Sequence, residues 1–162
     1  MNMFTLSLAT LRYPRELCYL MERQGVKYYT YTFQTNDAVI KYGKAADNEW
    51  QFGTWGNRIY RQAGGIPGWN GNELSDTSAV KMNVQLREHF PNVTRDQVVI
   101  TIYDYTSELE DLDQSEIDRI LLNEEDALVK KHTEVYGSPP KLNIQKTRTR
   151  TKPLFDNLFE VA

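Results

Sequence analysis

Two neighbouring β-rich segments restrict the fold of this chain more than any other part of its sequence. Residues 26–33 (VKYYTYTF) are almost all β-branched or aromatic, and residues 39–45 (VIKYGKA) begin with two β-formers and contain a glycine. Between them, residues 35–37 have the composition of a turn. The two segments therefore predict an antiparallel hairpin, in which Tyr31 and Phe33 share one side of the first strand.

Helices and a further strand are predicted to surround this hairpin. Residues 97–105 (QVVITIYDY) have the composition of a buried strand. Apolar residues at helical spacing, together with capping and stop residues, predict helices at 14–24, 56–63, 75–90 and 113–136. These elements predict an α+β fold with a small three-stranded, mainly antiparallel sheet flanked by helices.

Two of the helices carry residues that we expect to face the core. In the helix at 75–90 these residues are Val80, Val84 and Leu86. In the helix at 113–136 the apolar face consists of Ile117, Ile120, Leu121, Leu128 and Val135. Glu124 falls within this face and Glu125 falls on its edge. A carboxylate on an apolar face needs a partner or a cation, because an unpaired buried charge is costly.

The length and composition of the chain predict one domain of 162 residues. Residues 1–144 form the predicted domain, with an insertion at about 64–92, and residues 145–162 form a basic tail that ends in an apolar stretch. The chain has no run of about 18 apolar residues and no secretory signal at its N-terminus, so we expect a cytoplasmic protein without membrane contact. Its one cysteine, Cys18, is expected to be a buried thiol.

Charge is unevenly distributed along the chain. The net charge of −3 argues mildly against nucleic acid as a partner, because proteins that bind phosphate normally carry a basic surface. However, acidic residues are concentrated between 104 and 126, whereas residues 141–152 contain no acidic residue. The basic residues of that second segment are Lys141, Lys146, Arg148, Arg150 and Lys152. A chain with one acidic and one basic surface can bind a polyanion on the basic one.

Four residue types in the predicted elements are suited to phosphate chemistry. The hairpin is expected to present Tyr31 and Lys41 together, with Arg58 on the helix that follows and a glutamate on the long helix. A carboxylate can hold a hydrated divalent cation, an arginine binds phosphate oxygens in a fork, and a phenol or a lysine can help to move a proton from an attacking water. Because no Ser/His or Cys/His pair accompanies them, phosphodiester hydrolysis is favoured over acyl transfer.

The order of these residues resembles that of the GIY-YIG nucleases, a family named for two short strand motifs in a hairpin. The segment VIKYGKA resembles the second motif, with Gly43 in its glycine position and Lys41 in place of its tyrosine. Strand alternation directs Lys41, rather than Tyr42, to the side of the site. Tyr31 stands in the tyrosine position of the first motif, where Tyr29 replaces the glycine of the family.

The later motifs of the family follow in the same order. Arg58 stands in the position of the helical arginine, and residues 125–132 (EDALVKKH) are similar to the segment with the metal-binding glutamate. Residues 139–143 (PPKLN) resemble the closing segment with its asparagine. The loop before Arg58 is longer than usual, so Arg61 is an alternative for the arginine, and Glu124 is an alternative for the glutamate.

By this resemblance the chain is expected to be a Mg²⁺-dependent DNA endonuclease of the restriction, homing or phage type, with Mn²⁺ as a substitute metal. The implied roles are a general base for Tyr31, directly or through a water, charge beside the scissile phosphate for Lys41, transition-state stabilisation for Arg58, metal binding for Glu125 and bracing of the site for Asn143. Further DNA contacts are expected from Lys44, Arg61, Lys146, Arg148 and Arg150.

The implied partner is double-stranded DNA, and a homodimer would account for cleavage of both strands with one active site per chain. A first alternative is a non-catalytic module that binds nucleic acid or protein with the same scaffold. DNA binding that depends on salt but leads to no cleavage would favour this module. A second alternative is a structural domain, in which Tyr31, Lys41, Arg58 and Glu125 lie on separate surfaces.

Overall fold

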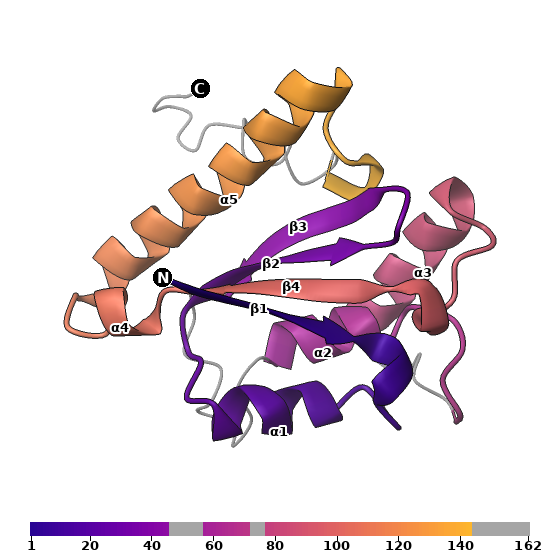
Figure 1. Cartoon of the computed structure of the whole chain (residues 1–162), viewed down its shortest axis with the longest axis horizontal. Coiled ribbons are helices and arrows are strands. Elements are labelled where there is room, and N and C mark those ends of the chain that lie inside the picture. The colour runs from indigo at the N-terminus through magenta and orange to yellow at the C-terminus, as the bar shows by residue number, and fades with distance from the viewer. Residues whose placement is uncertain (46–56, 72–76, 144–162) are drawn as a thin grey trace.

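A computed structural model describes residues 1–45, 57–71 and 77–143 (Figure 1). The strands are β1 (Asn2–Ser7), β2 (Tyr29–Gln34), β3 (Val39–Ala45) and β4 (Val99–Asp104). The α-helices are α1 (Glu16–Arg23), α2 (Asn57–Ala63), α3 (Thr77–His89), α4 (Thr106–Leu109) and α5 (Gln114–Tyr136). Short 3-10 helices are η1 (Leu8–Thr10), η3 (Arg95–Gln97) and η4 (Lys141–Asn143).

The four strands form one sheet in the order β1-β4-β2-β3, and every neighbouring pair is antiparallel. The α+β class is therefore confirmed, but the prediction of three strands was wrong. The fourth strand, β1, pairs with β4 from Asn2 opposite Asp104 to Ser7 opposite Val99. Its mixed sequence, NMFTLS, has little β character of its own, and the strand exists because β4 offers an edge with which it can pair.

Alternation along the central strand β2 gives the sheet two different faces. Tyr29, Tyr31 and Phe33 are fully buried in the main core, which also includes residues of α1, α2 and α3. Thr30 and Thr32 point to the opposite face, over which α5 lies. Figure 1 shows α5 (orange) on one side of the sheet and α1 and α2 on the other.

The long helix α5 begins and ends at the predicted residues. Asp113 caps its N-terminus by accepting a hydrogen bond from the backbone N–H of Glu116 at 2.9 Å, and Gly137 ends it with a φ of 87°. Its buried residues recur at helical spacing and are Ile117, Leu121, Glu125 and Val129. The predicted face was partly wrong, because Val135 is 64% exposed and Glu125, rather than Glu124, lies at the centre of the buried stripe.

The buried face of α3 also differs from the prediction. Val80 and Val84 are 43% and 59% exposed, whereas the buried residues are Ala79, Met82, Asn83 and Leu86. The backbone at the end of α2 approaches α3 so closely that a Cβ on Gly65 would lie 2.2 Å from the carbonyl oxygen of Ala79. Asn83 then donates a 2.8 Å hydrogen bond to the carbonyl of Gly65. This contact requires small or amide-bearing residues on α3, and hydrophobicity alone does not identify them.

Two further predictions concern single features of the chain. Cys18 is a buried free thiol, as expected. Across the described ranges, no helix has the length and apolar character that a membrane crossing requires.

Arg95 joins three segments that are distant in the sequence. Its Nη1 donates to the carbonyl oxygens of Leu8 and Leu11, at 2.7 Å each, and its Nε donates to the carbonyl oxygen of Gly68 at 3.1 Å. The guanidinium also lies over the ring of Trp69, 4.6 Å from the ring centroid. A planar fork with several fixed donors is needed to bind these carbonyls together.

We predict that Arg95→Lys destabilises the fold by about 1–3 kcal/mol, because lysine cannot serve the three carbonyls with one fixed geometry. Urea unfolding followed by tryptophan fluorescence measures the change. The matched control is Arg87→Lys, at an exposed position on α3, which should change the unfolding free energy by less than about 0.5 kcal/mol. Equal stability of the two variants would contradict the role of Arg95.

Candidate functional site

Tyr31 occupies the centre of the sheet and lies across Gly43. The two residues are opposite each other in the β2–β3 register. A Cβ on Gly43 would lie 2.3 Å from Cζ and 2.5 Å from the phenol oxygen of Tyr31, so the ring takes the space that a side chain would fill. Phe33 packs edge-on against the same ring, with 5.6 Å between centroids. The residue at position 43 must therefore be glycine if Tyr31 is to keep this position.

The phenol of Tyr31 reaches the following helix. It donates a 2.7 Å hydrogen bond to Oε1 of Gln62 on α2. Tyr31 itself has no exposed surface, and Gln62 is half-buried. Sequence reasoning did not single out Gln62, which is on α2 and has its partner on β2.

Lys41 lies on the same face of the sheet as Tyr31, because it is opposite Phe33 in the register. Tyr42 points to the other face, where its ring meets the ring of His132 of α5 edge-on, with 6.0 Å between centroids. Burial raises the pKa of Tyr42 above its usual value. Lys41 is half-buried. It is the charged residue of β3 that lies on the same face as Tyr31.

The other predicted cationic residues are not gathered at one place. Lys44 is opposite Thr30 and therefore belongs to the face that α5 covers. Arg58 and Arg61 are both on α2, where Arg61 is half-buried and the side chain of Arg58 falls outside the described part of the structure. Lys146, Arg148 and Arg150, with the rest of the predicted tail, also lie outside the described residues.

Glu125 is fully buried on the side of α5 that faces the sheet. The helix packs on the face opposite to Tyr31: Ile117 and Leu121 join Tyr28 in a second apolar cluster, and His132 meets Tyr42. The structure thus brings Tyr31 and Lys41 to one face of the sheet and Glu125 to the other.

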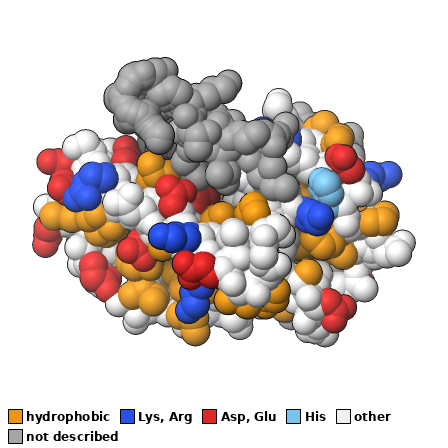
Figure 2. All heavy atoms as spheres, turned by 90° about the horizontal axis from the view of Figure 1, so that it is seen from above, with side chains coloured by type: hydrophobic (Ala, Val, Ile, Leu, Met, Phe, Trp, Pro, Cys, Tyr) orange, Lys and Arg blue, Asp and Glu red, His pale blue; other side chains and the backbone are white. Residues whose placement is uncertain are grey.

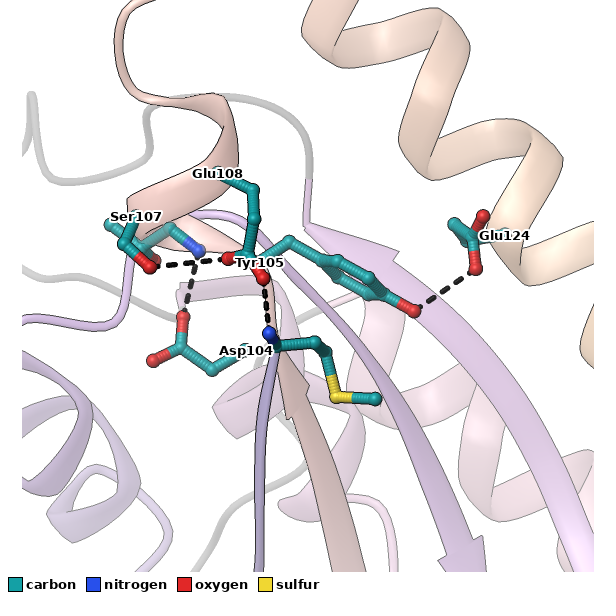
Figure 3. A network of polar contacts seen from close by, with 7 residues as sticks. Asp104, Tyr105, Ser107, Glu108 and Glu124 are labelled. Atoms are coloured by element: carbon teal, nitrogen blue, oxygen red, sulfur yellow. Dashed lines mark hydrogen bonds and ion pairs between the residues drawn. The ribbon is translucent and has the colours of Figure 1, made fainter.

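Glu124, the alternative to Glu125, is tied to the end of β4. It accepts a 3.0 Å hydrogen bond from the phenol of Tyr105, as Figure 3 shows. The pKa of Tyr105 is raised to about 12. Burial is the largest cause, and the hydrogen bond to Glu124 and the negative charge of Glu124 add to it. In the same network, Asp104 accepts a bond from the backbone N–H of Thr106. We interpret Glu124 as a residue that anchors α5 to the sheet.

Asn143 closes the edge of the sheet. Its Oδ1 accepts from the backbone N–H of Tyr42 at 2.8 Å, and its Nδ2 donates to the carbonyl of the same residue at 3.1 Å. The amide therefore pairs with β3 as a neighbouring strand would, although the two residues are 101 positions apart. Asn143 is buried, and it stands on η4, directly after the loop that follows α5.

The α5 side of the sheet carries oxygen donors of the kinds that a hard cation binds. Carboxylate and hydroxyl oxygens are the ligands that Mg²⁺ prefers, and Mg²⁺ often uses only one or two protein carboxylates. Glu125 offers a carboxylate, and the buried hydroxyls of Thr30 and Thr32 have no hydrogen-bond partner within the described ranges. No cluster of three or more His, Cys, Asp or Glu side chains suited to a metal occurs in the part of the chain that the structure describes.

The surface seen from the α5 side is mixed in charge. Figure 2 shows several acidic side chains at its left end, near α4, with basic and apolar side chains interspersed across the rest of the described surface. Comparisons of the chain with models of protein families, with curated proteins and with solved structures found no match.

We predict that Asn143→Ala releases the edge of β3. The backbone N–H and carbonyl of Tyr42 lose both partners, so the amide of Tyr42 should exchange with solvent about tenfold faster or more, which corresponds to a bond worth about 1–2 kcal/mol. NMR-detected hydrogen exchange measures this rate. In the control Asn123→Ala, at an exposed position on α5, the exchange of Tyr42 should stay unchanged. Unchanged exchange in Asn143→Ala would contradict the clamp.

Proposed function

We propose that this chain is a Mg²⁺-dependent endonuclease that hydrolyses DNA phosphodiester bonds, as its resemblance to the GIY-YIG nucleases implies. The single observation that carries the proposal is the packing of Tyr31 across Gly43. These residues stand in the tyrosine and glycine positions of the two strand motifs, and the contact gives a physical reason for that pairing.

The order of the elements also supports the proposal. Hairpin β2–β3 carries both motifs, α2 follows with Arg58 and Arg61, α5 carries Glu125, and η4 carries Asn143. The resemblance implies that Asn143 braces the site, and its two hydrogen bonds to β3 give it the means to do so. Asn143 and Tyr42 are 101 positions apart in the sequence. An accidental likeness of two short segments gives no reason for such distant residues to be in contact.

In the proposed site, each residue of the chain has a chemical task. Lys41 adds positive charge on the face of Tyr31, and an arginine of α2 grips phosphate oxygens. Glu125 would hold the Mg²⁺, for which Mn²⁺ would be a substitute. A divalent cation supplies Lewis-acid stabilisation of negative charge on phosphate oxygens. Preorganised charge of this kind typically contributes a rate factor of about 10²–10³ for each group.

The proposed substrate is double-stranded DNA. Lys44 and Arg61, both half-buried, supply charge within the domain, and the basic residues after 144 supply more. A homodimer would place two such sites on one duplex and so allow both strands to be cut.

A non-catalytic domain, with a binding or a structural role, is the second candidate, and one observation favours it. Tyr31 and Glu125 have no exposed surface, and they pack from opposite faces of the sheet. A module of this kind would bind nucleic acid or protein through its surface, with both residues serving the core. The two candidates differ in whether DNA is cut.

We predict that the purified chain converts supercoiled plasmid into nicked or linear DNA with Mg²⁺ or Mn²⁺ and not in EDTA. Glu125→Gln should lower this rate by at least about 100-fold, because the amide keeps the size of the side chain but loses the charge that holds the metal. The control is Glu134→Gln, the same change at an exposed position of α5, which should cleave as the unsubstituted chain does.

Thermal unfolding of Glu125→Gln checks that the fold is intact. Full cleavage by this variant would refute the metal assignment. DNA binding by the unsubstituted chain without cleavage under either metal would refute the nuclease and support the binding module.

A further inference from the structure

The two edges of the sheet are protected unequally (Figure 1). On the β3 edge, Asn143 binds the outward N–H and carbonyl of Tyr42, and the strand carries Lys41 and Lys44. Proteins prevent an edge strand from pairing with another chain by such charges, by prolines, by bulges or by covering groups. The β1 edge has the sequence NMFTLS, without a charged residue or a proline, and its register with β4 is regular.

Every second residue of β1 turns its backbone N–H and carbonyl away from β4. In antiparallel strands, these groups point to alternate sides along the chain. Leu8 follows β1 directly, and its N–H donates to the carbonyl of Val98 at 3.0 Å. The even-numbered residues of β1 therefore pair with β4, and the outward residues are Met3, Thr5 and Ser7.

The outward backbone groups are open to a further strand. Met3 is 62% exposed, Thr5 is also exposed and Ser7 is half-buried. Across the described ranges, the one hydrogen bond to these groups is a 2.7 Å bond from the hydroxyl of Thr10 to the carbonyl of Ser7. The edge thus offers a row of backbone donors and acceptors to which an extended strand can add.

We propose that β1 is a homodimer interface, where it pairs antiparallel with β1 of a second copy and Thr5 lies opposite Thr5 of that copy. In this register Met3 lies opposite Ser7 of the second copy, so the outward N–H and carbonyl groups gain partners. On the core side, Phe4 lies beside Leu6 of the second copy, and both are half-buried against the main core. Opposite threonines stabilise antiparallel strands, and the apolar contact buries further surface.

The charges on and beside the strand favour a second copy as the occupant. Because β1 is uncharged, its pairing with itself sets no like charges opposite each other. Antiparallel pairing also places the start of one β1 beside the end of the other. An ion pair between the N-terminal amino group and Glu108 holds α4 beside the start, where Glu110 and Asp111 are exposed.

Basic residues follow the other end of β1. There the chain continues to Arg12 and Arg15. Arg15 donates to the neutral phenol of Tyr60, and the side chain of Arg12 is 81% exposed although it also pairs with Glu16. The dimer therefore brings the acidic end of each copy to the basic end of the other, and such complementarity favours this pairing over others.

The proposed function calls for a homodimer but assigns it no surface; the β1 interface supplies one and does not rest on cleavage. Two-fold pairing of edge strands joins the strands of both copies into one continuous sheet. The axis stands perpendicular to that sheet, so the layers of α1, α2 and α3 from both copies lie on the same side.

The first experiment measures the mass of the full chain by sedimentation equilibrium, in EDTA and without DNA. We expect the mean mass to rise with concentration from one chain to two. Thr5→Pro removes an outward N–H but no bond to β4, so the dimer Kd should rise at least about tenfold while circular dichroism shows the fold retained. The control Thr5→Val keeps the N–H and should keep Kd within about threefold.

The second experiment tests the register with introduced cysteines. In the proposed pairing, the Cα atoms of the two residues at position 5 are about 5.5 Å apart, within reach of a disulfide, whereas those at position 3 are about 13 Å apart. With oxidised glutathione, Thr5→Cys should form a covalent dimer at least about tenfold faster than Met3→Cys. The unsubstituted chain is the control for Cys18, which is buried and should remain reduced.

Four results would overturn the β1 interface. They are the mass of one chain at every soluble concentration, an unchanged Kd in folded Thr5→Pro, equal cross-linking of the two cysteine variants, and assemblies larger than two chains. If Thr5→Pro does not fold, the cysteine variants decide. Plasmid cleavage is scored separately: its absence rejects the nuclease and leaves the dimer standing, whereas a chain that cleaves DNA as a monomer rejects the β1 interface alone.

Discussion

The packing of the Tyr31 ring across Gly43 is the contact on which the arrangement of this protein depends. It fixes β2 against β3 in one register, since a shift by one residue would turn Tyr31 to the face of α5. It also directs the phenol to Gln62 of α2, and so joins the sheet to the helix that carries Arg58. The absence of a side chain at Gly43 therefore allows β3, the Tyr31 ring and α2 to pack together.

The two faces of the sheet are stabilised in different ways. Aromatic and aliphatic packing dominates the face of α1, α2 and α3, whereas a smaller apolar cluster and several polar contacts hold α5 and η4 on or beside the other face. Tyr105 binds Glu124 at one end of the sheet, and Asn143 pairs with the middle of the edge strand β3. Residues from both faces enter the proposed function, so DNA cleavage would require groups that this fold separates by the thickness of the sheet.

Local patterns in the sequence predicted the elements well, because caps, turns and strand alternation act over a few residues. The hairpin, the cap at Asp113 and the stop at Gly137 depend on such short-range chemistry. The missed features depend on partners elsewhere. The strand β1 needs the edge of β4, and the buried face of α3 needs the close approach of Gly65. Gln62 gains its partner only when α2 packs beneath β2, so nothing in its own neighbourhood in the sequence indicates it.

The effect of Gly43→Ala in two backgrounds tests the central contact most directly. Gly43→Ala in the unsubstituted chain should lower the free energy of unfolding by about 1–3 kcal/mol, because the new Cβ meets the Tyr31 ring. In the background of Tyr31→Leu, which lacks the ring atoms that the Cβ would touch, Gly43→Ala should cost less than about 0.5 kcal/mol. An equal loss of stability in both backgrounds, measured by urea unfolding, would contradict the account.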